Sequence, residues 1–396
     1  MGEIMLGRSL PKLSVLVCAM AAMAGPALAA DQPLKVGWNS ELSGVWTFFG
    51  NACLDGARLA ETEVNAKGKK IDLIVQDNQS NPAQAAAVAR SLDTQEKVDL
   101  LSGPTNADVS LAVYGYAEDA KLPVLMPVAA FPQLTKPGTK QVFRMEPDAV
   151  GWGYAAVKFI KTMKSDAKIG VMMSDFAVNR AILAGLKYQA ERDGIAIVAE
   201  MLFPQSASDA TVQTAQMKAK KPDFVILAGG GAFDATLTRQ MLDVGFKPEQ
   251  LYHPYGSTKQ IMTWGERSIG SYFGTFFDHN LPNLTEQGKA FVENFRKVKN
   301  YPPGYTENYC YSTVYLLNEL VDKGAKGRDG IRAALREVNT KEVTTGVPIR
   351  FDQNGARIEY MYLMQLKSLS KDDFKTEKVN YMEWSPEVLP VYDLVR

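Results

Sequence analysis

The chain has 396 residues, of which 46% are hydrophobic, and it carries 44 Lys and Arg against 44 Asp and Glu. This length and apolar content predict a folded protein with a large core and two or more domains. The balanced charge, without a basic run interleaved with aromatic residues, argues against a nucleic-acid-binding surface.

The first residues differ in composition from the rest of the chain. Arg8 and Lys12 precede an apolar run from Leu13 to Met23, and Ala27-Leu28-Ala29 has the small residues of a cleavage site. The run is shorter than the roughly 20 residues that span a bilayer. We therefore expect residues 1–29 to be a signal peptide that is cleaved near Ala29, and the mature protein to reach the periplasm.

Beyond this leader, short apolar runs alternate with helical patterns. Asn81 followed by Pro82 marks the start of one helix, because Asn caps helices well and Pro fits their first turn. The apolar runs are continuous, as in parallel strands that are covered on both faces. The region up to Met126 therefore predicts a doubly wound α/β unit. Its strands are expected at Leu34–Trp38, Ile71–Gln76, Val98–Ser102 and Pro123–Met126, with further helices at Asn51–Lys67 and Asp108–Ala120.

The same pattern starts again after Asp148, and two successive series of similar size predict two lobes of one architecture. The strands of the second series are expected at Lys168–Met173, Ile195–Phe203, Phe224–Leu227, Leu251–Tyr255 and Tyr272–Phe277. Its helices are expected at Gly151–Met163, Ile182–Arg192, Thr211–Lys220 and Ala232–Val244.

The remaining part of the chain has a different pattern, with three consecutive helices and then a hairpin. The helices are expected at Glu286–Lys299, Tyr309–Lys323 and Gly330–Val338. The hairpin would pair Val347–Phe351 with Arg357–Leu366, because Asn354-Gly355 is a favoured turn sequence.

Two cysteines, Cys53 and Cys310, follow the predicted cleavage site. Both lie in apolar helical patterns, which favours two buried small hydrophobic residues. An oxidising compartment also permits a disulfide, and the sequence does not decide whether the two residues meet.

The sequence offers no catalytic constellation. Its two histidines, His253 and His279, have no neighbours at metal-ligand or catalytic spacing, and no nucleotide-binding or hydrolase motif occurs. A turn explains Gly229-Gly230-Gly231 better than a phosphate-binding loop does. We therefore expect a protein that is not an enzyme and that holds no metal or cofactor.

Several short segments carry a family resemblance through their order and spacing. They include Leu42-Ser43-Gly44, Phe49-Gly50, the segment from Lys121 to Pro127, Phe143-Arg144 and the helix from Tyr309 to Leu317. From about Leu34 to Leu366 the chain resembles the Leu/Ile/Val-binding protein family, the type I periplasmic solute-binding proteins of ABC importers.

The resemblance implies two doubly wound parallel-sheet lobes joined by three crossovers. The lobes would comprise residues 30–146 plus 279–350 and residues 147–278 plus 351–396. It also implies a monomer that closes over a small-molecule ligand by a hinge motion and then docks on ABC permease subunits.

The binding site implied by the resemblance differs in this sequence. In the family, hydroxyls and backbone groups of the first lobe hold an amino acid, and an acidic residue of the second lobe faces its ammonium. Ala107 and Ala130 stand here where hydroxyls are expected, and no carboxylate occurs near Tyr255-Gly256-Ser257. Since a buried ammonium without a partner is costly, these differences argue against a zwitterionic amino acid.

Aromatic residues gather instead on the loops that follow the strands, where ligands of open α/β sheets bind. Aromatic walls with a few polar anchors fit a small hydrophobic or aromatic carboxylate, for which Arg144 and Arg180 are candidate cations. Each aromatic residue also has a structural interpretation as part of the core, Arg144 as a hinge salt bridge, and Arg180 as a helix-surface residue. We expect the ligand-binding residues to be Trp46, Phe49, Ser102, Thr105, Asn106, Ala129, Ala130, Phe131, Phe176, Gly230, Phe233 and Tyr255.

Other functions remain compatible with the sequence. The ligand of a transport protein could be a branched-chain amino acid, or urea or another amide. The same fold could also serve as the ligand-sensing subunit of a signalling receptor. An amide-processing hydrolase is less favoured, because the loops lack a His or Cys nucleophile pair.

Overall fold

The computed structural model describes residues 1–2, 32–66, 68, 70–357, 359–370, 373–385 and 389–395. The predicted signal peptide, except for Met1 and Gly2, lies outside the described residues. The chain from Pro33 onward forms one compact unit, and only that unit is considered below. None of the helices described has the length and apolar character needed to cross a bilayer.

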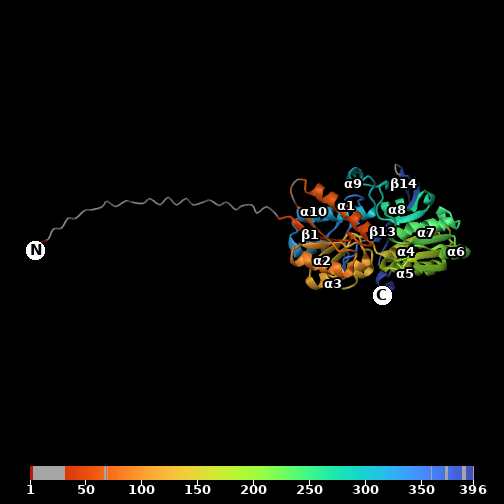
Figure 1. Ribbon diagram of the computed structural model, residues 1–396, viewed down its shortest axis with the longest axis horizontal. Helices are drawn as coiled ribbons and strands as arrows, with labels where there is room; N and C mark the ends of the chain where they lie inside the picture. Colours follow the sequence, from red (N-terminus) through yellow and green to blue (C-terminus); the bar gives the residue numbers. More distant parts are fainter. Residues whose placement is uncertain are drawn as a thin grey trace. The chain divides into compact units, whose positions relative to one another are not determined.

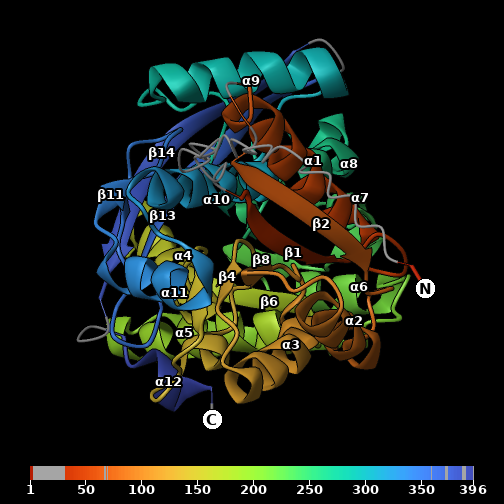
Figure 2. The ribbon, with the colours of Figure 1, turned by 90° about the vertical axis from the view of Figure 1, so that its left-hand side faces the viewer.

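The first sheet has five parallel strands in the order β2-β1-β3-β4-β5. Its strands are β1 (Leu34–Ser40), β2 (Ile71–Asp77), β3 (Leu100–Ser102), β4 (Val124–Met126) and β5 (Val142–Arg144). Figure 2 shows α1 and α10 on one side of this sheet and α2 and α3 on the other. These helices are α1 (Thr47–Val64), α2 (Pro82–Thr94), α3 (Ala107–Ala120) and α10 (Tyr305–Asp322). The predicted cap of α2 is confirmed, since the Asn81 side chain accepts a hydrogen bond from the Gln84 amide at 3.0 Å.

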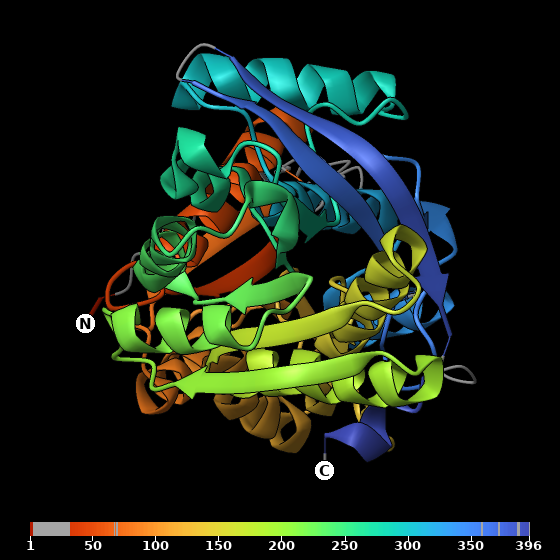
Figure 3. The ribbon, with the colours of Figure 1, turned by 90° about the vertical axis from the view of Figure 1, so that its right-hand side faces the viewer.

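The second sheet has seven strands in the order β14-β13-β10-β9-β8-β6-β7. It contains β6 (Lys168–Ser174), β7 (Ala196–Phe203), β8 (Phe224–Ala228), β9 (Leu251–His253), β10 (Tyr272–Thr275), β13 (Glu359–Leu369) and β14 (Phe374–Trp384). Strands β6 to β10 are parallel, and the long antiparallel pair β13–β14 forms one edge (Figure 3). The helices that cover it are α4 (Ala149–Met163), α5 (Ala177–Asp193), α6 (Thr211–Ala219) and α7 (Gly231–Asp243).

The chain passes between the two sheets three times (Figure 1). It leaves the first sheet after β5, returns after β10 to form α9, α10 and α11, and enters the second sheet again with β13. The predicted doubly wound fold with three crossovers is therefore confirmed. The remaining elements are α8 (Thr258–Trp264), α9 (Glu286–Lys299), α11 (Gly327–Glu337), β11 (Thr340–Lys341), β12 (Pro348–Ile349), α12 (Val391–Leu394) and the 3-10 helices η1 (Pro132–Thr135), η2 (Pro248–Gln250) and η3 (Glu266–Ser268).

The predicted hairpin between residues 347 and 366 is wrong. The Asn354-Gly355 turn forms, but β12 pairs with β11, while β13 pairs with β10 and β14. Among the described residues, a single bridge between Phe351 and Arg357 joins the two predicted arms. The sequence did not predict β14, because its exposed face is polar and its apolar residues are spaced irregularly.

The preference for two unpaired cysteines is also wrong. Cys53 on α1 and Cys310 on α10 form a disulfide, with their Cα atoms 5.2 Å apart. The two helices approach closely because Gly56 lacks a side chain, and a Cβ atom there would lie 2.1 Å from the Glu307 carbonyl oxygen. Helix contact therefore brings together two residues that are 257 positions apart in the chain.

Candidate functional site

A cavity lies where the carboxyl ends of strands from both sheets meet, as the rule for open α/β sheets predicts. It contains about 490 Å³ of space not filled by atoms, including space open to solvent. The cavity is lined by Trp46, Phe49, Thr105, Asn106, Ala107, Val128, Ala130, Glu146, Trp152, Phe176, Val178, Gly230, Tyr255 and Tyr305.

The aromatic residues come from both sides of the cavity. Trp46 precedes α1 on the first sheet, Phe176 precedes α5 on the second, and their ring centroids are 5.5 Å apart. On the second side, Trp152 and Tyr255 have ring centroids 5.6 Å apart. Tilted rings at such distances attract one another beyond their burial, so the contact between Trp46 and Phe176 stabilises the approach of the two sides.

Backbone geometry and an amide side chain position these rings. Gly230 has a φ of +69°, and a Cβ atom there would lie 3.1 Å from a ring carbon of Phe176. The Tyr255 hydroxyl donates a hydrogen bond to Asn179 Oδ1 at 3.5 Å. The Asn179 amide in turn donates to the carbonyl oxygens of Ser174 at 2.9 Å and Ala228 at 2.8 Å, at the ends of β6 and β8. The strand ends therefore fix the orientation of the Tyr255 ring.

Glu146 is the one charged side chain among the described residues that line the cavity. It is 2% exposed, and its Oε1 atom has no hydrogen-bond partner among the described residues. Burial disfavours the carboxylate and raises the pKa of Glu146 to about 8, although the charge of Arg144 and the Ala129 amide act in the opposite direction. The Oε1 atom of this buried carboxyl group is therefore available to a ligand.

A second buried carboxylate, Glu41, occupies the amino-terminal end of α3. Its oxygens accept hydrogen bonds from the amides of Thr105 at 3.1 Å and Asn106 at 3.0 Å, and from the Thr105 hydroxyl at 3.0 Å. Burial raises the pKa of Glu41, and these hydrogen bonds oppose that effect. The first amides of a helix attract anions, and here the protein's own side chain supplies the anion.

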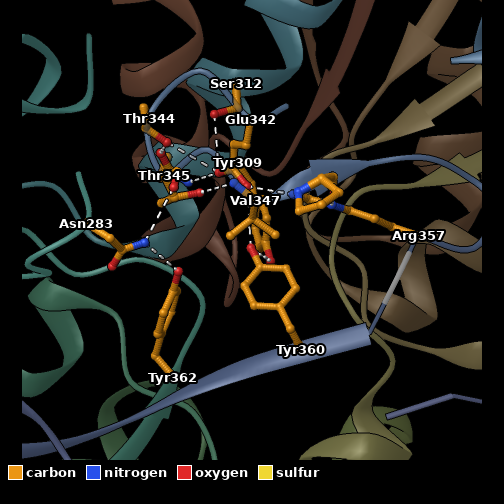
Figure 4. A network of polar contacts seen from close by, with 12 residues as sticks. Asn283, Tyr309, Ser312, Glu342, Thr344, Thr345, Val347, Arg357, Tyr360 and Tyr362 are labelled. Carbon is orange, nitrogen blue, oxygen red and sulfur yellow. Dashed lines mark hydrogen bonds and ion pairs between the residues drawn. The ribbon is translucent and has the colours of Figure 1, made fainter. Parts of the chain in front are cut away.

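Phe276 connects the lining of the cavity to a buried polar network (Figure 4). Phe276 contacts the lining residues Trp152 at 5.3 Å and Tyr305 at 5.6 Å, and also Tyr360 at 5.9 Å, measured between ring centroids. Beyond Tyr360, Arg357 Nη2 donates to Glu342 Oε2 at 2.8 Å, and both of these side chains are fully buried. This ion pair joins two chain segments that flank the third crossing between the sheets.

Eight of the twelve residues predicted from the sequence line the cavity. They come from segments that follow the carboxyl ends of six different strands, so the chain brings together residues far apart in sequence. These residues are Trp46, Phe49, Thr105, Asn106, Ala130, Phe176, Gly230 and Tyr255.

Four predicted residues do not line the cavity. The Ser102 hydroxyl donates to the Leu125 carbonyl oxygen at 2.9 Å and so ties β3 to β4. Ala129 is buried in the core between the first sheet and α2 and α3. Phe131 precedes η1 and packs against the core. Phe233 packs on Phe203 with ring centroids 5.3 Å apart, and it borders an adjoining hollow instead.

Neither candidate cation lines the cavity. Arg144 is buried and donates to the Glu146 carbonyl oxygen and, at 3.4 Å, to Thr135 Oγ1. Arg180 lies on the surface of α5 and forms an ion pair with Asp175 at 2.7 Å. Arg180 therefore has the helix-surface role that was its alternative interpretation, whereas Arg144 forms hydrogen bonds within the first lobe.

The lining residues that the sequence did not predict are Ala107, Val128, Glu146, Trp152, Val178 and Tyr305. Glu146 and Trp152 follow β5, at the first crossing between the sheets, and that loop was taken as a connection only. Tyr305 was missed because α10 begins four residues before the predicted Tyr309. The signal that could have identified Glu146 is a carboxylate directly after Phe143-Arg144, where the chain crosses between the sheets.

The family model described as periplasmic binding protein matches residues 33–373. An amino acid binding protein of Pseudomonas aeruginosa is 24% identical over 335 residues, which cover 83% of this chain and 88% of that protein. A Leu/Ile/Val-binding protein of Rhizobium johnstonii is 21% identical over 339 residues, which cover 85% of this chain and 91% of that protein.

Solved structures share the fold over most of their length. The substrate-binding protein of a branched-chain amino acid transporter from Streptococcus pneumoniae, in complex with isoleucine, has a TM-score of 0.77 and 26% identity, covering 88% of this chain and 99% of that one. A solute-binding protein of an ABC transporter from Rhodopseudomonas palustris, in complex with 3,4-dihydroxybenzoic acid, has a TM-score of 0.78 and 21% identity, covering 89% and 97%.

Proposed function

The chain belongs to the periplasmic binding protein family, and from this premise we propose that it is the solute-binding component of an ABC importer. The observation that carries the proposal is the aromatic cavity, which is lined by loops at the carboxyl ends of strands from both sheets. Similar structures from transporters hold isoleucine and 3,4-dihydroxybenzoic acid, two small molecules with an apolar or aromatic body. The protein is accordingly a binding protein and not an enzyme.

We propose that two lobes close around the solute. Residues 30–146 plus 279–350 would move as one lobe, and residues 147–278 plus 351–396 as the other. The contact between Trp46 and Phe176 supports this, because it joins the first turn of a first-sheet helix to that of a second-sheet helix. A ligand that contacts both sides shifts the population towards the closed form, which permease subunits would recognise.

The protein acts outside the cytoplasm, as its family implies. The apolar leader with its small-residue cleavage site supports export through a signal peptide that ends near Ala29. A periplasmic location also agrees with the disulfide between Cys53 and Cys310, since disulfides persist in oxidising compartments.

Thermal unfolding and titration calorimetry with small solutes test the proposal. The panel would contain aromatic acids, branched-chain amino acids and short amides, and we expect at least one class to stabilise the protein. Phe176→Ala should weaken that binding by about fivefold or more, because an aromatic contact contributes about 1 kcal/mol beyond its buried area.

Phe224→Ala is the matched control, because Phe224 is a half-buried aromatic residue at the amino end of β8, away from the cavity. Binding that survives Phe176→Ala but is lost in Phe224→Ala would contradict the proposed site.

A further inference from the structure

The charges around the cavity indicate which kind of solute it accepts. No lysine, arginine or histidine is among the described lining residues, and the one carboxyl group there is that of Glu146, whose Oε1 atom has no hydrogen-bond partner among the described residues. A buried carboxylate solute needs a cation or several free hydrogen-bond donors, because losing water otherwise costs several kcal/mol. The described lining offers no cation, and its one buried donor without a hydrogen-bond partner is Trp152 Nε1.

The strongest set of anion-binding donors near the cavity is already in use. Thr105 and Asn106 line the cavity, but their amides and the Thr105 hydroxyl donate to Glu41. A carboxylate solute would have to displace Glu41, which is fully buried and held through both of its oxygens. Glu41 therefore takes the place that an anion would need at the start of α3.

The remaining lining groups favour a positive charge. Aromatic ring faces attract cations, and the attraction is strongest where water is excluded. Trp46, Trp152, Phe176 and Tyr255 surround the same space as Glu146, and Trp152 and Tyr255 approach each other to 5.6 Å. Rings together with a single carboxylate form the arrangement that recognises ammonium groups.

We infer that the solute is an organic cation, an amine or alkylated amine on a small apolar body, whose ammonium group lies between these rings and the Glu146 carboxylate. This inference rests on the proposed function and names the chemical class of its solute. Burial raises the pKa of Glu146 to about 8, and a bound ammonium would lower this pKa because it stabilises the carboxylate. The inference differs from the carboxylate solute expected from the sequence.

Titration calorimetry with matched probes tests the inference on the purified protein. One set is 2-phenylethylamine, 2-phenylethanol and phenylacetate, and the second is 3-methylbutylamine, 3-methylbutanol and leucine. We expect each amine to bind at least about tenfold more tightly than the alcohol and the acid of its set. Tighter binding of phenylacetate or leucine would overturn the inference and leave the proposed function intact.

Two variants test the named carboxylates. Glu146→Gln should weaken amine binding by about tenfold and leave alcohol binding unchanged. The matched control Asp175→Asn removes an exposed charge beside Phe176 and should change neither. Glu41→Ala frees the donors at the start of α3 and should raise the affinity for phenylacetate by about tenfold. Amine binding that is equal in wild type and Glu146→Gln would overturn the inference.

If no probe binds, the compound that co-purifies with the protein tests the inference instead. Mass spectrometry of an acid-denatured sample identifies such a compound and its ionisable groups. A released amine supports the inference, and a released carboxylic acid without an amine overturns it. If no probe binds and no compound is released, the proposed function itself fails.

Discussion

Replacing Glu146 by glutamine should remove a pH-dependent contribution to the stability of the protein. Glu146 is 2% exposed, and the groups that act on it are the Arg144 charge, the Ala129 amide and the Tyr305 side chain. Its pKa is about 8 in the folded protein and 4.5 for an ordinary glutamate, since burial disfavours the carboxylate. Glutamine has nearly the same size but does not titrate.

The size of this effect follows from the difference between the two pKa values. Each pH unit corresponds to about 1.36 kcal/mol, so the shift from 4.5 to about 8 amounts to roughly 5 kcal/mol. The folded pKa is raised, so the stability that the protonated group contributes is fully present below pH 4.5. It is lost as the pH rises towards 8. Relative to wild type, Glu146→Gln should therefore gain stability between pH 5 and pH 8.

Denaturant unfolding of the ligand-free wild type and variant at pH 5 and pH 8 measures this difference. Other groups that titrate in this range are common to both proteins and cancel in the comparison. The control Asp175→Asn removes an exposed carboxylate and should show no such trend. A difference in unfolding free energy between Glu146→Gln and wild type that does not change with pH would refute the reasoning.

Three further predictions concern buried groups outside the cavity. Replacing both Cys53 and Cys310 by alanine should lower the unfolding free energy by about 2–5 kcal/mol, and a reductant should have the same effect on wild type only. Burial lowers the pKa of His253 from 6.5 to about 4, so wild type should lose about 3 kcal/mol as the pH falls from 6.5 to 4, whereas His253→Phe should not. Glu342→Gln leaves the buried Arg357 without its counter-charge and should cost about 3–5 kcal/mol, and the double variant with Arg357→Met should recover part of this loss. In denaturant unfolding, stability equal to that of wild type would contradict the cysteine and Glu342 predictions, and a pH dependence of His253→Phe equal to that of wild type would contradict the His253 prediction.

The parallel strands and the general position of the site could be predicted from the sequence. Continuous apolar runs such as Ile71–Gln76 indicate strands covered on both faces, and the structure places β2 there. The carboxyl-end rule then located the loops with Trp46, Phe176 and Tyr255, which line the cavity.

Other features depend on contacts that sequence patterns do not encode. Ser102 and Phe233 lie on the predicted strand-end loops, but a hydrogen bond across β3–β4 and the Phe203 ring hold their side chains elsewhere. Strand β13 pairs with β14 at the edge of the sheet, although the Asn354-Gly355 turn suggested a different partner. The Cys53–Cys310 disulfide likewise depends on how closely α1 and α10 pack.

The position of the bound solute in a crystal structure of the protein tests the account most directly. We predict that the apolar body of the solute lies against Trp46 and Phe176 and that a positively charged nitrogen lies within hydrogen-bond distance of Glu146. A solute that binds elsewhere, or whose carboxylate replaces Glu41 at the start of α3, would contradict it.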